Sequence, residues 1–214
     1  MNSAPRRAAD TARALALAAA LAPLLVAVPA APAAANAPAD SAVTAAASAR
    51  PPSAVVTALT EARLAGEGIL RWFGLKIYEA RLWIGAEGLE PARFASKPFA
   101  LDLRYSRSLK GDSIARTSHE EIERLGFGDP GRRDAWLEAM RGIFPDVREG
   151  DRITGVNRPG RGVSFYRNDR SIGSIDDPEF APAFFAIWLD PRTIAPGLRE
   201  QLLARIDARP GAPR

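Results

Sequence analysis

Two polar side chains in residues 64–84 have the chemistry to bind an acidic group. This segment reads LAGEGILRWFGLKIYEARLWI, and Arg71 and Tyr78 stand among its apolar residues. A guanidinium donates charge-assisted hydrogen bonds to a carboxylate, and a phenol adds a neutral donor. Polar groups in apolar surroundings need partners. The pair therefore predicts either a site for an acidic ligand or partners inside the protein. The carboxylates available to Arg71 are those of Glu67, Glu79 and Asp102.

The residues around the pair alternate as β-strands do. Counted from Leu75 with a period of two, Tyr78 shares a face with Ala80, Leu82 and Ile84, and the other face is also mostly apolar. This pattern predicts a strand covered on both sides. From 99 to 105 the pattern predicts a strand with one buried face and one wetter face. The buried face holds Phe99, Leu101, Leu103 and Tyr105, and the wetter face holds Ala100, Asp102 and Arg104.

The rest of the chain predicts helices and short strands in a regular order. Helices are expected from Gly111 to a stop at Gly126, over 136–144, after Asp177 as far as Asp190, and near 198–206. Strands are expected over 152–157, 162–167 and 171–175, with Asn168 and Asp169 as a hairpin loop. The order β-β-β-α-α-β-β-β-α-α predicts an α+β fold, with an antiparallel sheet and helices packed on it.

The first residues have the form of an export signal. Arg6, Arg7 and Arg13 precede an apolar run, and small residues with A-x-A sites follow it. We expect a signal peptide at 1–35, a disordered linker rich in Ala and Pro at 36–53, and a folded domain at 54–208. The protein is expected to be exported, with no membrane span after the leader is removed.

Charge and composition exclude several classes of function. The chain has 29 Lys and Arg against 25 Asp and Glu, and the leader alone holds three of the Arg and one Asp. The near balance and the scattered Arg residues do not favour nucleic-acid binding. The absence of cysteine excludes disulfides, thiolate catalysis and Cys-based zinc sites.

Other candidate sites are less favoured by the sequence. His119 is the single histidine, and Ser118 beside it on a helix cannot face it as a nucleophile would. A solvated helix histidine is the preferred interpretation. His119 or Tyr78 as the axial ligand of a haem is a further alternative, because one axial residue can suffice.

Four segments, in order, resemble the chalcone isomerase-like family. They are LAGEG followed by GLKIYEARLWI, then LKGDSIARTSHEEI, then IFPD before EGDRITG, and last IDDPEFAPAFFAIWLDPRT. The resemblance covers about residues 55–207. It implies an open-faced β-sandwich, in which helices cover one face of a large antiparallel sheet and a hydrophobic cleft lies between them. Members of the family are cofactor-free isomerases that form flavonoids, or fatty-acid-binding and other non-catalytic relatives.

The resemblance also implies site residues. The polar residues of the isomerases fall on Arg71, Tyr78, Ile114, Glu121 and Ile187 of this chain. Ile114 and Ile187 offer no donor or acceptor, so the polar groups that orient a chalcone are missing there. Tyr78 beside Arg71 is similar to the fatty-acid-binding branch, where Arg and Tyr hold a carboxylate. The wall around the tail is then expected to include Ile114, Phe180, Phe184 and Ile187.

The main hypothesis is an exported, non-catalytic protein that binds a hydrophobic small molecule such as a fatty acid in the cleft between sheet and helices. The alternatives are an intramolecular lyase of the chalcone isomerase type, acting on a conjugated ketone, and a haem-binding protein. The main hypothesis requires no cofactor, no metal and no nucleic acid. The sequence leaves the oligomeric state open.

Overall fold

The structure is a computed structural model, and it describes residues 50–206. Six strands form one antiparallel sheet in which sequence neighbours are spatial neighbours, from β1 at one edge to β6 at the other. The strands are β1 (Arg63–Trp72), β2 (Leu75–Ile84), β3 (Phe99–Tyr105), β4 (Arg152–Arg158), β5 (Gly162–Arg167) and β6 (Arg170–Ile175). The predicted strands and their meander are confirmed.

Four helices follow the predicted order, and two short ones were not predicted. The four are α3 (Gly111–Leu125), α4 (Pro130–Ile143), α5 (Phe180–Leu189) and α6 (Pro196–Leu203). The additional elements are α2 (Ser53–Ala58) and the 3₁₀ helix η4 (Pro91–Ser96). The predicted signal peptide and the predicted linker as far as residue 49 lie outside the described residues. Among the helices in residues 50–206, none is long and apolar enough to span a membrane.

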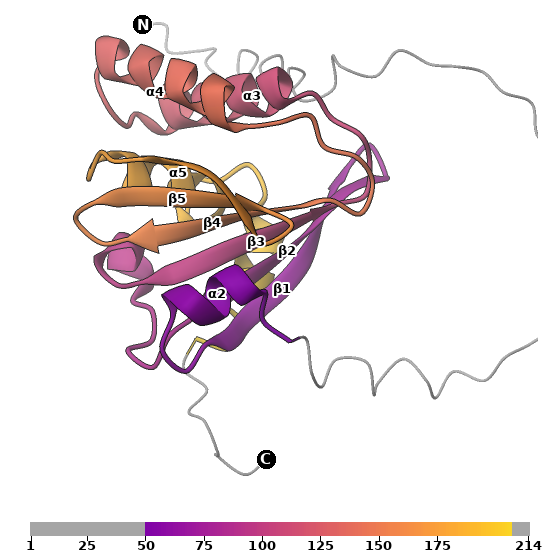
Figure 1. Cartoon of the computed structure of the whole chain (residues 1–214), viewed down its shortest axis with the longest axis vertical. Helices are drawn as coiled ribbons and strands as arrows, with labels where there is room; N and C mark the ends of the chain where they lie inside the picture. Colours follow the sequence, from indigo (N-terminus) through magenta and orange to yellow (C-terminus); the bar gives the residue numbers. More distant parts are fainter. Residues whose placement is uncertain (1–49, 207–214) are drawn as a thin grey trace, which may run out of the picture. The chain divides into compact units, whose positions relative to one another are not determined.

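The main core lies between the sheet and the longer helices. Ala80, Leu82 and Ile84 of β2 join Leu101 and Leu103 of β3 in this buried cluster. Figure 1 shows α5 behind the sheet and α3 and α4 beside each other above it. The cluster also contains residues from each of these three helices, including Ala115, Met140 and Phe184. The predicted α+β architecture is therefore confirmed.

Close contact between β1 and α6 depends on two glycines. A Cβ atom on Gly66 would lie 2.1 Å from the carbonyl oxygen of Gln201, and one on Gly68 would lie 2.7 Å from Leu198 Cδ1. The amide of Arg205 also donates to the carbonyl of Ala65 at 2.7 Å. The C-terminal helix can therefore lie directly on the edge strand because no side chain separates the two backbones.

The second face of the sheet is also partly buried, which the sequence analysis predicted for β2 but not for β3. Of the three residues expected on a wetter face of β3, only Arg104 is exposed, whereas Ala100 and Asp102 are buried. Figure 1 shows α2 in front of the sheet, on the side opposite α5, and α2 contacts β4. The prediction was wrong at Asp102 because the α2 segment, assigned in part to a linker, folds against this face.

Asp102 leads to a prediction about pH. Burial raises the pKa of this carboxyl above its usual value, although Thr154 Oγ1 donates a hydrogen bond to it at 2.6 Å. A raised pKa means that the folded protein retains a proton that the unfolded chain has lost. Asp102 therefore contributes a loss of stability as the pH rises through the window above about 4.

We expect Asp102→Asn to remove this contribution while an oxygen still accepts from Thr154. The free energy of unfolding of the variant, measured by urea denaturation between about pH 4 and 7, should rise relative to the parent as the pH increases. The difference between the two proteins is the relevant quantity, because other carboxyls such as Asp151 and Asp169 have lowered pKa values and act in the opposite direction. A constant difference across this range would contradict the assignment.

Candidate ligand-binding site

Two tyrosines lie opposite each other on neighbouring strands, beneath the helices. Tyr78 of β2 pairs with Tyr105 of β3, and their rings meet edge to face with centroids 5.9 Å apart. Trp188 of α5 donates from Nε1 to the Tyr78 hydroxyl at 2.9 Å. These three residues, Tyr78, Tyr105 and Trp188, form a polar cluster within an otherwise apolar layer, and we refer to them as the tyrosine cluster.

Both phenols of the cluster are neutral hydrogen-bond donors. Burial raises the pKa of Tyr78 well above its usual value, against the lowering effect of the Trp188 hydrogen bond, and the Glu121 carboxylate raises it further. Burial also raises the pKa of Tyr105, with Tyr78 adding to the effect. Because Tyr78 accepts from Trp188, its own proton is free to be donated. Within residues 50–206 the Tyr105 hydroxyl has no hydrogen-bond partner, so two donors are available to a ligand oxygen.

Glu121, whose carboxylate raises the pKa of Tyr78, forms an ion pair. It lies on α3 and accepts two hydrogen bonds from Arg124, at 3.0 and 2.8 Å. The side chain of Glu121 is 12% exposed and that of Arg124 is 32% exposed, so only the carboxylate side of the pair is shielded from water. Both hydrogen bonds go to the same oxygen, Oε2, so the ion pair fixes the orientation of the carboxylate.

The layer between α5 and the sheet is filled by aromatic rings. Phe184 lies at its centre, with ring centroids 5.2 Å from Phe165 and 5.3 Å from each of Phe180, Phe185 and Trp188. Ile114 and Ile187, two other residues of the predicted wall, are partly buried and pack against the same core. The structure thus places Tyr78, Ile114, Phe180, Phe184 and Ile187 in or against one apolar layer.

Arg71 is the exception among the predicted site residues. It is exposed near the turn between β1 and β2, where its Nη1 donates to the carbonyl of Gly74 at 3.5 Å. Leu70 pairs directly with Tyr78, whereas Arg71 lies beyond a register shift and lines a surface hollow with Ile69 and Glu79, on the other face of the sheet. The structure therefore does not bring Arg71 and Tyr78 together as one head-group site. Strand alternation separates two residues that look close in the sequence.

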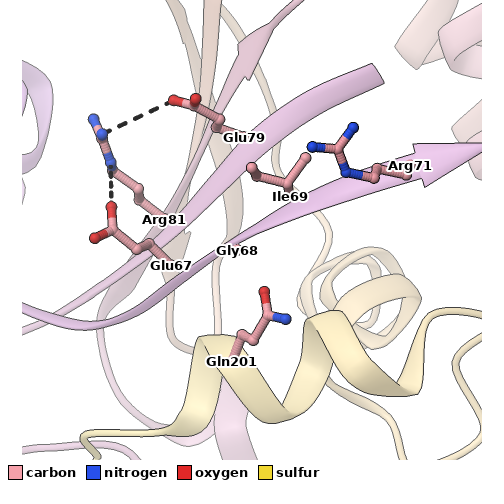
Figure 2. Close-up of a pocket in the computed structure, with 7 residues that line it drawn as sticks. All are labelled: Glu67, Gly68, Ile69, Arg71, Glu79, Arg81 and Gln201. Carbon is pink, nitrogen blue, oxygen red and sulfur yellow. Dashed lines mark hydrogen bonds and ion pairs between the residues drawn. The ribbon is translucent and has the colours of Figure 1, made fainter. Parts of the chain in front are cut away.

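Two of the carboxylates that were expected to be available to Arg71, those of Glu67 and Glu79, lie against Arg81 instead. Arg81 Nε donates to Glu67 at 3.0 Å, and Arg81 Nη2 lies 4.0 Å from Glu79. Figure 2 shows Arg81 between these two carboxylates and Arg71 apart from them, in a surface hollow of about 560 Å³ at the β1 edge. Gly68, Ile69 and Gln201 complete its lining. Because its central charges neutralise each other, the hollow is a weaker candidate for an acidic ligand than the tyrosine cluster.

His119 and the acidic residues do not assemble a metal site in the described part of the chain. His119 is half-buried, and its Nδ1 lies 3.2 Å from the carbonyl of Arg133. Within residues 50–206 no group of three His, Asp or Glu side chains could hold a metal ion. Asp177 accepts from Trp136 Nε1 and from the amide of Glu179, each at 2.9 Å, and so ties α4 to the start of α5.

Tyr105 and Trp188 were not among the predicted site residues. Tyr105 ends an alternating run, a pattern that predicts an ordinary core residue. Trp188 lies in an apolar helix, where an aromatic residue is also expected to belong to the core. The signal that could have found Tyr105 is its register, because an antiparallel β2–β3 pair brings the ends of the two apolar faces together.

The sheet, the helices over one face and the tyrosine cluster define an α+β protein of the open-faced sandwich type. A model of the family described as "Chalcone isomerase-like" matches residues 43–204, which is most of the chain. The chain belongs to the chalcone isomerase-like family.

A solved structure with the same fold is that of a plant protein. It is the crystal structure of the Arabidopsis thaliana fatty-acid binding protein AtFAP1, with a TM-score of 0.55 and 15% sequence identity. The match covers 68% of this chain and 89% of that one. No curated protein sequence matches this chain significantly. At this identity the likeness to AtFAP1 shows a common fold.

Proposed function

We propose that this protein is an exported, non-catalytic binding protein for a hydrophobic small molecule with an oxygen-bearing end, such as a fatty acid. The observation that carries the proposal is the tyrosine cluster, which presents two neutral donors inside an apolar layer. A site of this kind, mostly hydrocarbon with a few polar groups that fix orientation, suits an acyl chain. The name of AtFAP1, a fatty-acid binding protein of the same fold, supports the same class of ligand.

Two positions that correspond to polar residues of the isomerases carry no polar group in this chain, which supports binding without catalysis. Ile114 and Ile187, where the isomerases have polar residues, are hydrocarbon side chains. Glu121 is ion-paired with Arg124 through one of its carboxylate oxygens. The acyl tail is proposed to lie along the aromatic layer beneath α5, and since those rings are in contact, we expect them to rearrange when the ligand enters.

The test of this function is to identify a ligand and then to weaken its head-group contact. Native mass spectrometry and lipid extraction of protein purified from its own host should reveal a co-purifying acid. Intact mass of the same sample tests export, because removal of the leader shortens the chain to a start near residue 36. Cyclisation of a chalcone at rates typical of an enzyme would contradict the non-catalytic assignment.

Removing either hydroxyl of the tyrosine cluster should weaken binding without unfolding the protein. Tyr78→Phe and Tyr105→Phe keep the rings and each remove one hydrogen bond worth about 0.5–1.5 kcal/mol, which is roughly a twofold to tenfold loss of affinity. Calorimetric titration with palmitic acid measures the change.

Two controls should leave the affinity for palmitic acid unchanged. Tyr166→Phe alters a tyrosine next to the buried Phe165, on the opposite face of the sheet, and Arg71→Ala removes an exposed cation from that same face. An affinity that falls with Arg71→Ala and not with Tyr105→Phe would move the head group away from the cluster.

A further inference from the structure

The turn between β1 and β2 carries exposed apolar side chains that the fold does not use. Phe73 is 78% exposed and Leu75 is 46% exposed, and Ile69 on the same hairpin is 40% exposed. Of the five large apolar residues that are exposed within residues 50–206, these three belong to one hairpin. Figure 1 shows this hairpin in purple at the end of the sheet, beside the loops that connect β3 to α3 and α4 to β4.

The backbone at Phe73 indicates that this residue is not there for stability. Phe73 and Gly74 form a two-residue turn with φ angles of 47° and 78°. A turn of this type favours Asn, Asp or Gly at its first position, because a bulky residue with positive φ is strained. A strained residue whose side chain is exposed gains nothing from the core. Such strain points to a role for the side chain outside the fold.

Cations surround the apolar tip. Arg71 and Lys76 pair with each other directly behind the turn. Arg104 is exposed one strand away, and Arg107 follows Ser106, whose amide donates to the Ile77 carbonyl at 2.9 Å. Lys76 is ion-paired with Glu79, whereas Arg71, Arg104 and Arg107 form no ion pair within the described part of the chain. The tip therefore combines a convex apolar end with an excess of positive charge.

We propose that the β1–β2 hairpin docks on an anionic lipid bilayer, with Phe73 and Leu75 entering the interface and the arginines contacting lipid phosphates. Trp72, whose ring lies 5.3 Å from that of Phe73, is of the residue type enriched at membrane interfaces. A two-residue turn offers far less than the roughly 800 Å² that each partner of a stable protein complex buries. A bilayer accepts a small convex tip, and its phosphates complement the cations. This docking does not rest on the proposed ligand, and it is measured without one.

The chain contains no cysteine, so a single introduced cysteine can be labelled at a single known position. Leu75→Cys in the full chain, labelled with the environment-sensitive dye NBD, should shift its emission to the blue with vesicles of phosphatidylglycerol and phosphatidylcholine. Vesicles of phosphatidylcholine alone should give a much smaller shift. The matched control is Val56→Cys, because Val56 is an apolar residue of α2 that is 58% exposed, and its label should not respond.

Phe73→Asn separates docking from folding. Asn suits the turn, so the melting temperature should be unchanged or higher, while vesicle binding reported by the label at position 75 should fall about tenfold or more. Arg71→Gln should lower it about fivefold. Three results would each overturn the proposal. They are equal emission shifts of the labels at positions 56 and 75, equal binding to vesicles with and without phosphatidylglycerol, and undiminished vesicle binding by Phe73→Asn. Blue-shifted emission at position 75 before vesicles are added would place the tip against protein instead and would also overturn it.

Discussion

Replacing Phe184 by alanine is expected to lower the free energy of unfolding by about 3–5 kcal/mol. Phe184 is buried at the centre of the aromatic layer, in ring contact with Phe165, Phe180, Phe185 and Trp188. Removing the ring forfeits its transfer free energy and leaves a cavity that interlocked neighbours can close only in part. Urea denaturation measures the change directly.

Two further variants test the interpretation of this loss. Phe184→Leu restores much of the volume and should recover a substantial part of the stability. Phe73→Asn removes an aromatic ring from the exposed turn and should not destabilise the protein, because that ring contributes little to the core. If Phe184→Ala lost less than about 1 kcal/mol, well below the usual range for a buried Phe, the layer beneath α5 would be loosely packed.

Replacing Gly66 by alanine is expected to be the second large effect, although it adds only one methyl group. The new Cβ would lie 2.1 Å from the carbonyl oxygen of Gln201 and 2.4 Å from that of Leu202. Both atoms are backbone, so α6 must move as a unit, and its residues Leu198 and Leu202 are buried in the core. Overpacking of this kind costs about 1–3 kcal/mol, and more where the neighbour cannot yield.

The control for this variant is another Gly→Ala exchange. Gly142 lies in α4 with no atom within 4 Å of the position where its Cβ would be built. Gly142→Ala should therefore be neutral or stabilise by up to about 1 kcal/mol. Thermal melts of both variants, with limited proteolysis to follow release of α6, give the comparison. Equal stability of the two would show that α6 does not rest on β1 as the structure has it.

The two surfaces with proposed functions lie in different parts of the same hairpin. Tyr78 belongs to the third residue pair from the turn and faces the helices, whereas Phe73 is at the turn itself. The Tyr105→Phe and Phe73→Asn variants affect only one surface each, so loss of one function need not accompany loss of the other.

Secondary structure and the order of elements were predictable from local patterns. Alternation with a period of two identified β2 and β3, and Gly126 and the Asn168–Asp169 loop marked the ends of elements correctly. These signals are local, because side-chain direction follows from backbone periodicity. The family was also recognisable from ordered segments that span most of the domain, and the family match confirms it.

The site was predictable only in part. Tyr78 and the apolar residues Ile114, Phe180, Phe184 and Ile187 lie in or against the helix-side layer, although a ligand there remains a prediction. Tyr105 and Trp188 join Tyr78 from distant positions in the chain, and no local pattern indicates that meeting. Arg71 was assigned to the same site because a long cation and a phenol stand in one apolar segment, as the resemblance to the fatty-acid-binding branch also implied.

By itself, then, the sequence of this protein determined which segments are strands and helices and which family they form. Only the tertiary structure decided which side of the sheet each polar group faces and what covers it. Neighbouring residues of a strand point to opposite faces, and Arg71 lines the hollow beside Ile69 and Glu79, on the face away from the layer that Tyr78 enters. The burial of Asp102 likewise depends on the face of the sheet against which α2 packs, a contact between segments that no local pattern encodes.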